Sequence, residues 1–196
     1  MTGVEVFDAL KEIASFLKKK RFRFALIGGL AASCRGRART TNDVDLTLWA
    51  ELGEELPILK AILKGFPARE PDPIGFALAN RVLLITATNG VPIDIGLAMH
   101  PFEEEMLRRA TQFEVIRGLR VPVLAAEDIV VTKVFAGRTQ DWFDVEGLFD
   151  RLGAKLDYSA IVHRLTEIGE LFDLDEGLAH LERIRVQAND VEDPNQ

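Results

Sequence analysis

The chain has 196 residues, of which 47% are apolar and 28% charged, a composition typical of a globular protein with one substantial core. Its formal charge of −7 argues against a surface devoted to nucleic acid, and its longest nearly uncharged run, Phe24 to Cys34, is too short to span a bilayer. The chain opens without a secretory signal pattern, and its single cysteine excludes an intrachain disulfide, so we expect a cytoplasmic protein.

The N-terminal part of the chain predicts a helix, a strand and a second helix. Apolar residues at helical spacing from Val4 to Lys20 indicate an amphipathic helix, and the run from Phe24 to Gly28 indicates a buried strand that ends at a glycine pair. The small residues from Leu30 to Cys34 then predict a short helix. Because Gly28 and Gly29 have no side chains, a phosphate can approach their backbone and meet the amides that open this helix.

Two basic clusters flank this region. The first, from Lys18 to Arg23, is interpreted as a solvated helix end, since cations suit helix C-termini. The second has arginines at alternate positions, Arg35, Arg37 and Arg39, and it can neutralise a triphosphate because it lies beside the glycine pair.

The next strand carries two carboxylates at alternate positions, Asp43 and Asp45, among Val44, Leu46 and Leu48. Side chains two residues apart in a strand share a face, so both acids are expected to point the same way. Like charges held this close repel each other, and a divalent cation with oxygen ligands removes the repulsion. The pattern therefore predicts a site where carboxylates, a metal and a phosphate meet.

A second amphipathic helix is expected from Glu51 to Phe66, and three prolines, Pro67, Pro71 and Pro73, then predict a loop. Two strands, 82–88 and 91–97, are joined by Asn89-Gly90, a pair suited to a two-residue type I′ turn. Asp94 lies in the second of them. An acid there is either a solvent-facing residue or a third metal ligand, and the preceding pair of acids favours the ligand.

The rest of the chain predicts a helix from Pro101, a hairpin around Arg117-Gly118, and then helices alone. We therefore expect a mixed α/β core over residues 1–124 and a helical region over 125–186. Residues 187–196, which are polar and acidic, are expected to form a disordered tail.

The glycine pair, the short helix and the Asp-x-Asp strand together resemble the nucleotidyltransferase superfamily that includes DNA polymerase beta. The nearer resemblance is to AbiEii-like and related small bacterial nucleotidyltransferases, in which an Arg-x-Thr-x-Asp-x-Asp-like stretch follows the glycine pair. Here that stretch is Arg39-Thr40-Thr41-Asn42-Asp43-Val44-Asp45. A later run also looks like the one that follows the core in these proteins: Glu127-Asp128, Lys133, Ala136, Arg138, Asp141 and Asp144.

The resemblance implies a nucleotidyltransferase-type mixed β-sheet flanked by helices, with a C-terminal helical extension. It implies that Asp43, Asp45 and Asp94 are catalytic and bind metal, with two Mg²⁺ ions expected and Mn²⁺ as the alternative. The nucleotide-binding residues expected are Gly28, Gly29, Ser33, Arg39, Thr41 and Lys133. Many superfamily members carry serine at the position of Gly29, and Ser33 is the candidate replacement. Arg138, Asp141 and Asp144 are equally well explained as an ion-pair network at a helix junction.

The function expected is metal-dependent transfer of a nucleoside monophosphate from ATP or another nucleoside triphosphate to an acceptor hydroxyl. The acceptor is RNA such as tRNA, a protein or a small molecule, and a toxin role with an antitoxin partner is one possibility. Two alternatives are kept: an inactive nucleotide-binding or toxin–antitoxin interaction protein, and a metal-dependent phosphohydrolase. The residues favour no particular base, acceptor or oligomeric state.

Overall fold

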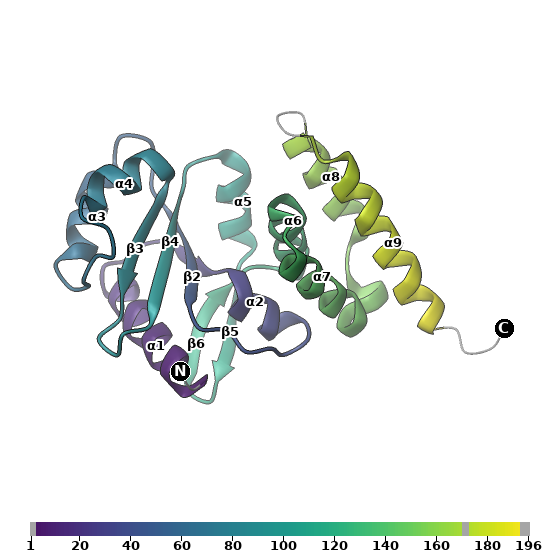
Figure 1. The fold of residues 1–196 in the computed structure, drawn as a ribbon, viewed down its shortest axis with the longest axis horizontal. Helices are drawn as coiled ribbons and strands as arrows, with labels where there is room; N and C mark the ends of the chain where they lie inside the picture. Colours follow the sequence, from purple (N-terminus) through teal and green to yellow (C-terminus); the bar gives the residue numbers. More distant parts are fainter. Residues whose placement is uncertain (1–2, 170–172, 193–196) are drawn as a thin grey trace. The chain divides into compact units, whose positions relative to one another are not determined.

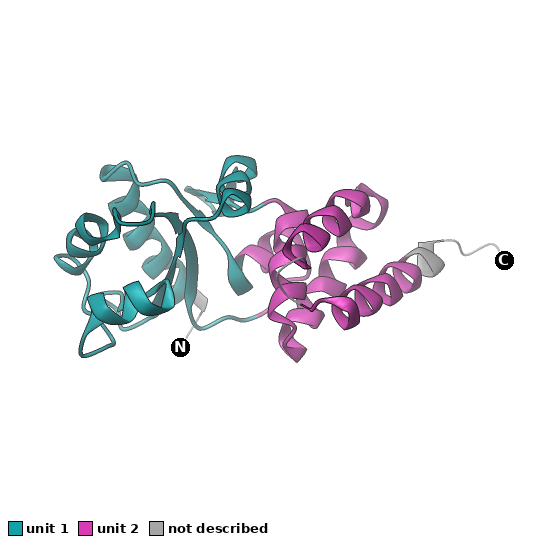
Figure 2. Ribbon diagram, turned by 90° about the horizontal axis from the view of Figure 1, so that it is seen from above, with its two compact units in different colours: residues 1–30, 40–124 teal, residues 31–39, 125–196 magenta. Residues whose placement is uncertain are grey.

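The computed structural model describes residues 3–169 and 173–192, which belong to two compact units (Figure 2). The sheet unit comprises Met1–Leu30 and Thr40–Leu124, and the helical unit comprises Ala31–Arg39 and Ala125–Gln196. The sequence predicts one boundary, after Leu124. Contacts place the short segment 31–39 with the helical unit as well, so the chain passes between the units three times.

The sheet unit is built on a mixed sheet whose order, in the described residues, is β3-β4-β2-β1-β6-β5 (Figure 1). The strands are β1 (Phe24–Leu26), β2 (Val44–Trp49), β3 (Val82–Thr86), β4 (Pro92–Ala98), β5 (Thr111–Ile116) and β6 (Leu119–Val123). The pairs β2–β4 and β1–β6 are parallel, and the other neighbours are antiparallel. This arrangement confirms the mixed α/β class that the sequence predicts.

Helices flank this sheet and complete its core. They are α1 (Gly3–Lys19), α3 (Glu55–Leu63), α4 (Pro73–Asn80) and α5 (Pro101–Arg109), together with the start of α2 (Gly28–Arg35). The apolar stripe predicted for α1 is buried at Leu10, Ile13 and Leu17, and strand residues such as Leu46 and Ile93 are also fully buried. Burying such a side chain stabilises the fold by about 1.5–3 kcal/mol. The apolar residues therefore determine which face of each strand packs on the core, and the other face points away from it.

The helical unit contains the end of α2 and the helices α6 (Ala126–Ala136), α7 (Thr139–Leu152), η1 (Gly153–Lys155), α8 (Tyr158–Gly169) and α9 (Asp175–Glu192). Its core includes Val130, Val145 and Ile161, all fully buried. A buried ion pair joins α6 to α8, because Arg164 Nη1 lies 3.0 Å from Asp128 Oδ1 and Asp128 is fully buried.

Three local expectations differ from the structure. The proline segment contains helix α4, because Pro73 occupies its first turn and Asp72 caps it by accepting a hydrogen bond from the Gly75 amide at 3.0 Å. The β3–β4 turn is not type I′, since only Gly90 (φ +85°) has a positive φ, whereas that turn needs two such residues. Helix α9 runs to Glu192, across most of the expected tail, whose last four residues lie outside the described ones.

None of the helices in residues 3–169 and 173–192 combines the length and apolarity needed to cross a bilayer.

Tyr158, the chain's single tyrosine, provides a pH test of the helical unit. Its hydroxyl donates a hydrogen bond to Glu182 at 2.6 Å, linking α8 to α9, and Arg185 lies over its ring. Burial and the Glu182 carboxylate raise the pKa of Tyr158 to about 12. The raised pKa favours the neutral phenol in the folded state, so this stabilisation is complete below pH about 10 and is lost as the pH rises through about 12.

We therefore expect tyrosinate absorbance to rise with a midpoint near 12 in the folded protein and near about 10 in denaturant. In Glu182→Gln the folded midpoint should fall toward the unfolded value, because the carboxylate that opposes ionisation is gone. Equal midpoints for folded and unfolded wild-type protein would show that the Tyr158–Glu182 contact does not form.

Candidate active site

The two strands that carry the predicted acids are neighbours in the sheet. Asp45 on β2 and Asp94 on β4 are directly paired in the parallel register, so their side chains project from the same face. The residues on either side of each acid, such as Val44 and Ile93, are fully buried, whereas the acids are partly exposed. The enzyme hypothesis requires this shared face, because carboxylates on opposite faces could not bind one cation.

Asp43 lies close to Asp94, although it is not on the strand where the sequence predicts it. Strand β2 begins at Val44, so Asp43 precedes it by one residue and is held by the Thr41 hydroxyl, which donates a hydrogen bond to Asp43 Oδ1 at 2.7 Å. Its charge reaches Asp94. Burial raises the pKa of the Asp94 carboxyl, Arg69 opposes that rise, and the negative charge of Asp43 adds to it. The acids therefore interact across the two strands.

Gly28 packs directly against the side chain of Asp45. Strand β1 ends before it, and its φ of +63° is a left-handed conformation that favours glycine. A Cβ built on Gly28 would lie 1.9 Å from Asp45 Oδ2, closer than any real contact. Position 28 therefore requires glycine for two reasons: the backbone is left-handed there, and the Asp45 carboxylate leaves no room for a Cβ. Gly29 follows in the first turn of α2, where backbone amides have no partner within the helix.

Sequence analysis missed one residue of this site, Arg69. Its guanidinium forms an ion pair with Asp94 Oδ1. Its own amide donates to the Leu84 carbonyl at 3.0 Å, and the preceding Ala68 forms a bridge with Ile85, so the segment is attached to the outer side of β3. A single arginine in a stretch bounded by prolines matches no sequence motif. Its place beside Asp94 becomes evident only from the pairing of this stretch with β3.

The donor set fits a hard divalent cation in its chemistry, because three carboxylates and water are the ligands that Mg²⁺ and Mn²⁺ take. Gly28 leaves room for the Asp45 carboxylate at the same place. Across residues 3–169 and 173–192, however, no group of three or more His, Cys, Asp or Glu side chains is already arranged to hold a metal ion. At Asp94, one carboxylate oxygen is bound to Arg69 instead.

The other predicted nucleotide-binding residues, Ser33, Arg39 and Lys133, belong to the helical unit. Ser33 Oγ lies 3.3 Å from both the amide and the carbonyl oxygen of Arg39. Arg39 binds Asp144 with two hydrogen bonds, of 2.6 and 3.0 Å. Lys133 is 5% exposed, and its ammonium lies 2.8 Å from both Asp141 and Asp144.

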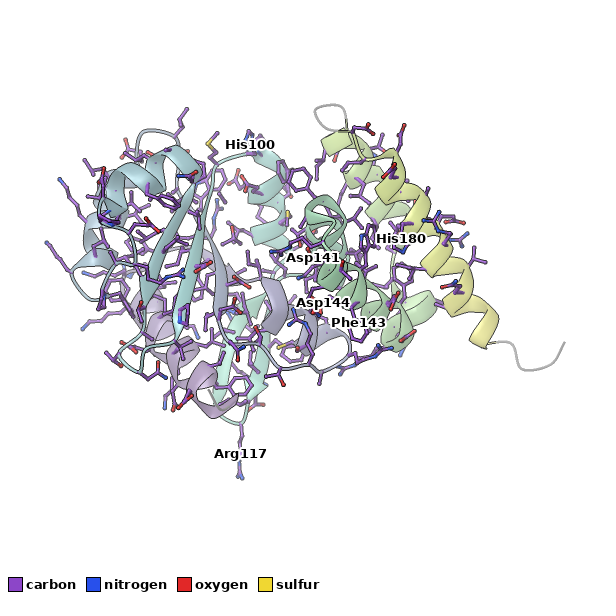
Figure 3. The ribbon with its side chains drawn as sticks, viewed as in Figure 1. His100, Arg117, Asp141, Phe143, Asp144 and His180 are labelled. Atoms are coloured by element: carbon purple, nitrogen blue, oxygen red, sulfur yellow. The ribbon has the colours of Figure 1, made fainter. Side chains whose placement is uncertain are left out.

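These contacts form an ion-pair network between α6 and α7 that also includes Arg39 of the segment 31–39. Both of its carboxylates, Asp141 and Asp144, lie on α7 (Figure 3) and are nearly fully buried. Arg138 adds a contact of 2.7 Å to Asp141. Lys133 thus bridges two buried acids of α7.

The segment 31–39 is also attached to α7 by close backbone packing, which the sequence analysis did not identify. A Cβ on Gly147 would lie 2.8 Å from Arg37 Cβ, and a Cβ on Gly36 would lie 3.0 Å from the Gly147 carbonyl. Arg151 donates to the Gly36 carbonyl at 2.9 Å. A glycine inside the amphipathic helix α7 is the signal that could have indicated this packing.

Gly147→Ala is accordingly expected to destabilise the protein by about 1–3 kcal/mol, because the added methyl overpacks the contact with Arg37. The matched control is Gly169→Ala in α8, where a Cβ meets nothing within 4 Å and alanine should be neutral or slightly stabilising. Denaturant unfolding of both variants measures the difference. Equal stability of the two would contradict the packing of segment 31–39 on α7.

The acids lie on the neighbouring parallel strands β2 and β4, and the match to a family model identifies the class of this protein as a nucleotidyltransferase. Residues 9–193 match the model of the family described as nucleotidyl transferase AbiEii toxin, type IV toxin–antitoxin system, so the chain belongs to that family. The family resemblance stated from the sequence is thereby confirmed. No curated protein matches the chain significantly.

Several solved structures share the fold. The solution structure of the antibiotic-resistance factor ANT(2″)-Ia aligns with a TM-score of 0.58 and 16% identity, covering 97% of this chain and 95% of that one. A nucleotidyltransferase-like protein from Paracoccidioides brasiliensis aligns at 0.54 and 14%, covering 93% and 94%. The lincomycin-bound lincosamide adenylyltransferase LnuA aligns at 0.50 and 12%, covering 76% and 96%.

Proposed function

We propose that this nucleotidyltransferase is active and metal-dependent, and that it transfers a nucleoside monophosphate from a nucleoside triphosphate to an acceptor hydroxyl. One observation carries the proposal: Asp45 and Asp94 are paired on neighbouring strands and face the same side, with Gly28 packed on Asp45. A protein that only bound nucleotide would have no need of three mutually repelling acids at this place.

In this proposal Asp43, Asp45 and Asp94 hold the divalent cations, with Mg²⁺ or Mn²⁺ both suited to carboxylate oxygens. When bound, the cations would activate the acceptor hydroxyl and stabilise charge on the triphosphate. Thr41 keeps the Asp43 carboxylate in place through its hydrogen bond. Asp94, whose pKa burial raises, is suited to accept the hydroxyl proton at a carboxylate oxygen.

The phosphates would be bound by the backbone at the start of α2. Gly28 and Gly29 present no side chains there, and the first-turn amides carry partial positive charge. The nucleotide-binding role of Ser33, Arg39 and Lys133 stays a prediction, since their contacts lie within the helical unit.

We further propose that the protein acts as the toxin of a toxin–antitoxin pair. The family match covers most of the chain, whereas the likeness to antibiotic-modifying enzymes such as LnuA concerns the fold alone. An RNA or protein acceptor, and an antitoxin as the partner, are therefore favoured over an antibiotic.

The test is incubation of the protein with Mg²⁺ and each nucleoside triphosphate labelled at the α-phosphate, in separate reactions with cellular RNA, cellular protein and small-molecule alcohols. The proposal expects label in one acceptor fraction and release of pyrophosphate. Tight triphosphate binding without label transfer would instead identify an inactive binding protein. Release of inorganic phosphate without any labelled acceptor would identify a phosphohydrolase.

A further inference from the structure

Arg69 is placed at the acidic site by backbone pairing and not by a flexible loop. The Arg69 amide binds the Leu84 carbonyl, and the Thr86 amide binds the Pro67 carbonyl at 2.9 Å, so residues 67–69 lie along the free side of β3. Leu84 is itself paired with Asp94. Arg69, Leu84 and Asp94 therefore form a row across three adjacent segments, and the guanidinium reaches the acid over the intervening strand.

Both side chains of the Arg69–Asp94 ion pair are partly exposed to solvent. The two side chains are 32% and 38% exposed, so the pair is held by much less energy than a buried one and can be broken at small cost. It also acts against a repulsion, because Asp43 is close enough to raise the pKa of Asp94. Arg69 thus supplies a positive charge where two carboxylates oppose each other.

A cation that used Asp94 as a ligand would compete with Arg69 for the same carboxylate oxygen, Oδ1. We propose that Arg69 is a positioning residue that binds Asp94 in the cation-free site, yields it to the divalent cation, and then binds the triphosphate. The second role is supported by the contacts that link Arg69 to the proposed phosphate site: Arg69 binds Asp94, Asp94 is paired with Asp45, and Asp45 packs on Gly28. A guanidinium released from Asp94 can pair with phosphate oxygens through two parallel hydrogen bonds. This inference rests on the proposed function of the three acids.

The competition between Arg69 and the cation for Asp94 is tested by measuring Mn²⁺ binding to the full chain without nucleotide. Electron paramagnetic resonance reports the concentration of the free ion. Arg69→Ala is expected to bind Mn²⁺ about fivefold more tightly than wild type, the size of effect that loss of a half-exposed ion pair allows. The same variant should bind a non-hydrolysable triphosphate in the presence of Mn²⁺ at least about tenfold more weakly, because a charged hydrogen-bond donor is missing.

Two further variants make the test specific. Arg117→Ala removes an arginine that projects from the β5–β6 hairpin (Figure 3), and it should change neither affinity. Arg69→Gln keeps a polar side chain on the same backbone hydrogen bonds, and it should repeat both shifts if Arg69→Ala is poorly folded. Thermal unfolding monitored by circular dichroism establishes the folded state of each variant.

Tighter Mn²⁺ binding together with weaker triphosphate binding in the Arg69 variants would support the proposal that Arg69 leaves Asp94 for the triphosphate. Unchanged or weaker Mn²⁺ binding in both Arg69 variants, or an unchanged triphosphate affinity, would overturn it while leaving the proposed function intact. If wild type and Asp45→Asn bound Mn²⁺ equally poorly, the metal role of the three acids would fail, and this inference would fail with it.

Discussion

Asp45→Asn is expected to lower the rate of nucleotidyl transfer by about three orders of magnitude or more without unfolding the protein. Asn has nearly the size of Asp, so it fits beside Gly28 and keeps the place of residue 45 in β2. What it lacks is the negative charge that attracts a cation. The core faces of β2 and β4 are apolar and fully buried, and the variant keeps this burial, so we expect the sheet to remain folded.

The rate of label transfer from an α-labelled triphosphate, measured beside a thermal unfolding curve, separates the two effects. Asp8→Asn on the exposed surface of α1 is the control, because it removes the same charge from the sheet unit and should leave the rate unchanged. Transfer by Asp45→Asn at the wild-type rate would show that Asp45 has no part in the chemistry.

Gly28→Ala should also abolish most of the activity, by at least about a hundredfold, through displacement of Asp45. The added methyl would lie 1.9 Å from Asp45 Oδ2, so either the carboxylate or the start of α2 must move. The backbone adds strain of about 1–2 kcal/mol, since φ at Gly28 is +63°. We therefore expect lower stability as well as lower activity.

The matched control for this variant is Gly118→Ala. Gly118 has a φ of +83°, yet a Cβ there meets nothing within 4 Å, so alanine imposes backbone strain without a collision. Gly118→Ala should lose about 1–2 kcal/mol of stability and keep full activity. If Gly28→Ala behaved in the same way, the contact between Gly28 and Asp45 would have no functional importance.

The acids on the strands could be found from the sequence because strand periodicity is local. Asp45 and Asp94 each interrupt a run of apolar residues, and alternation alone predicts that they turn away from the core. Helix α4 is also within reach of the sequence, since Asp72 followed by Pro73 is the pattern of a helix start.

Other features depend on pairing between distant segments. The register that sets Asp94 beside Asp45, and the attachment of Arg69 to β3, join stretches that no local pattern relates. The resemblance implies a nucleotide-binding role for Lys133, but no sequence pattern indicates that this residue is buried with two acids of α7 compensating its charge. Its environment follows from the packing of α6 on α7, which periodicity does not specify.

The most direct test of the central claim is a crystal structure of the protein with Mn²⁺ and a non-hydrolysable nucleoside triphosphate, with the metal located by anomalous scattering. We expect Mn²⁺ bound to oxygens of Asp43, Asp45 and Asp94, with the phosphates at the start of α2. Manganese bound elsewhere, or a triphosphate distant from Gly28 and Gly29, would contradict this expectation.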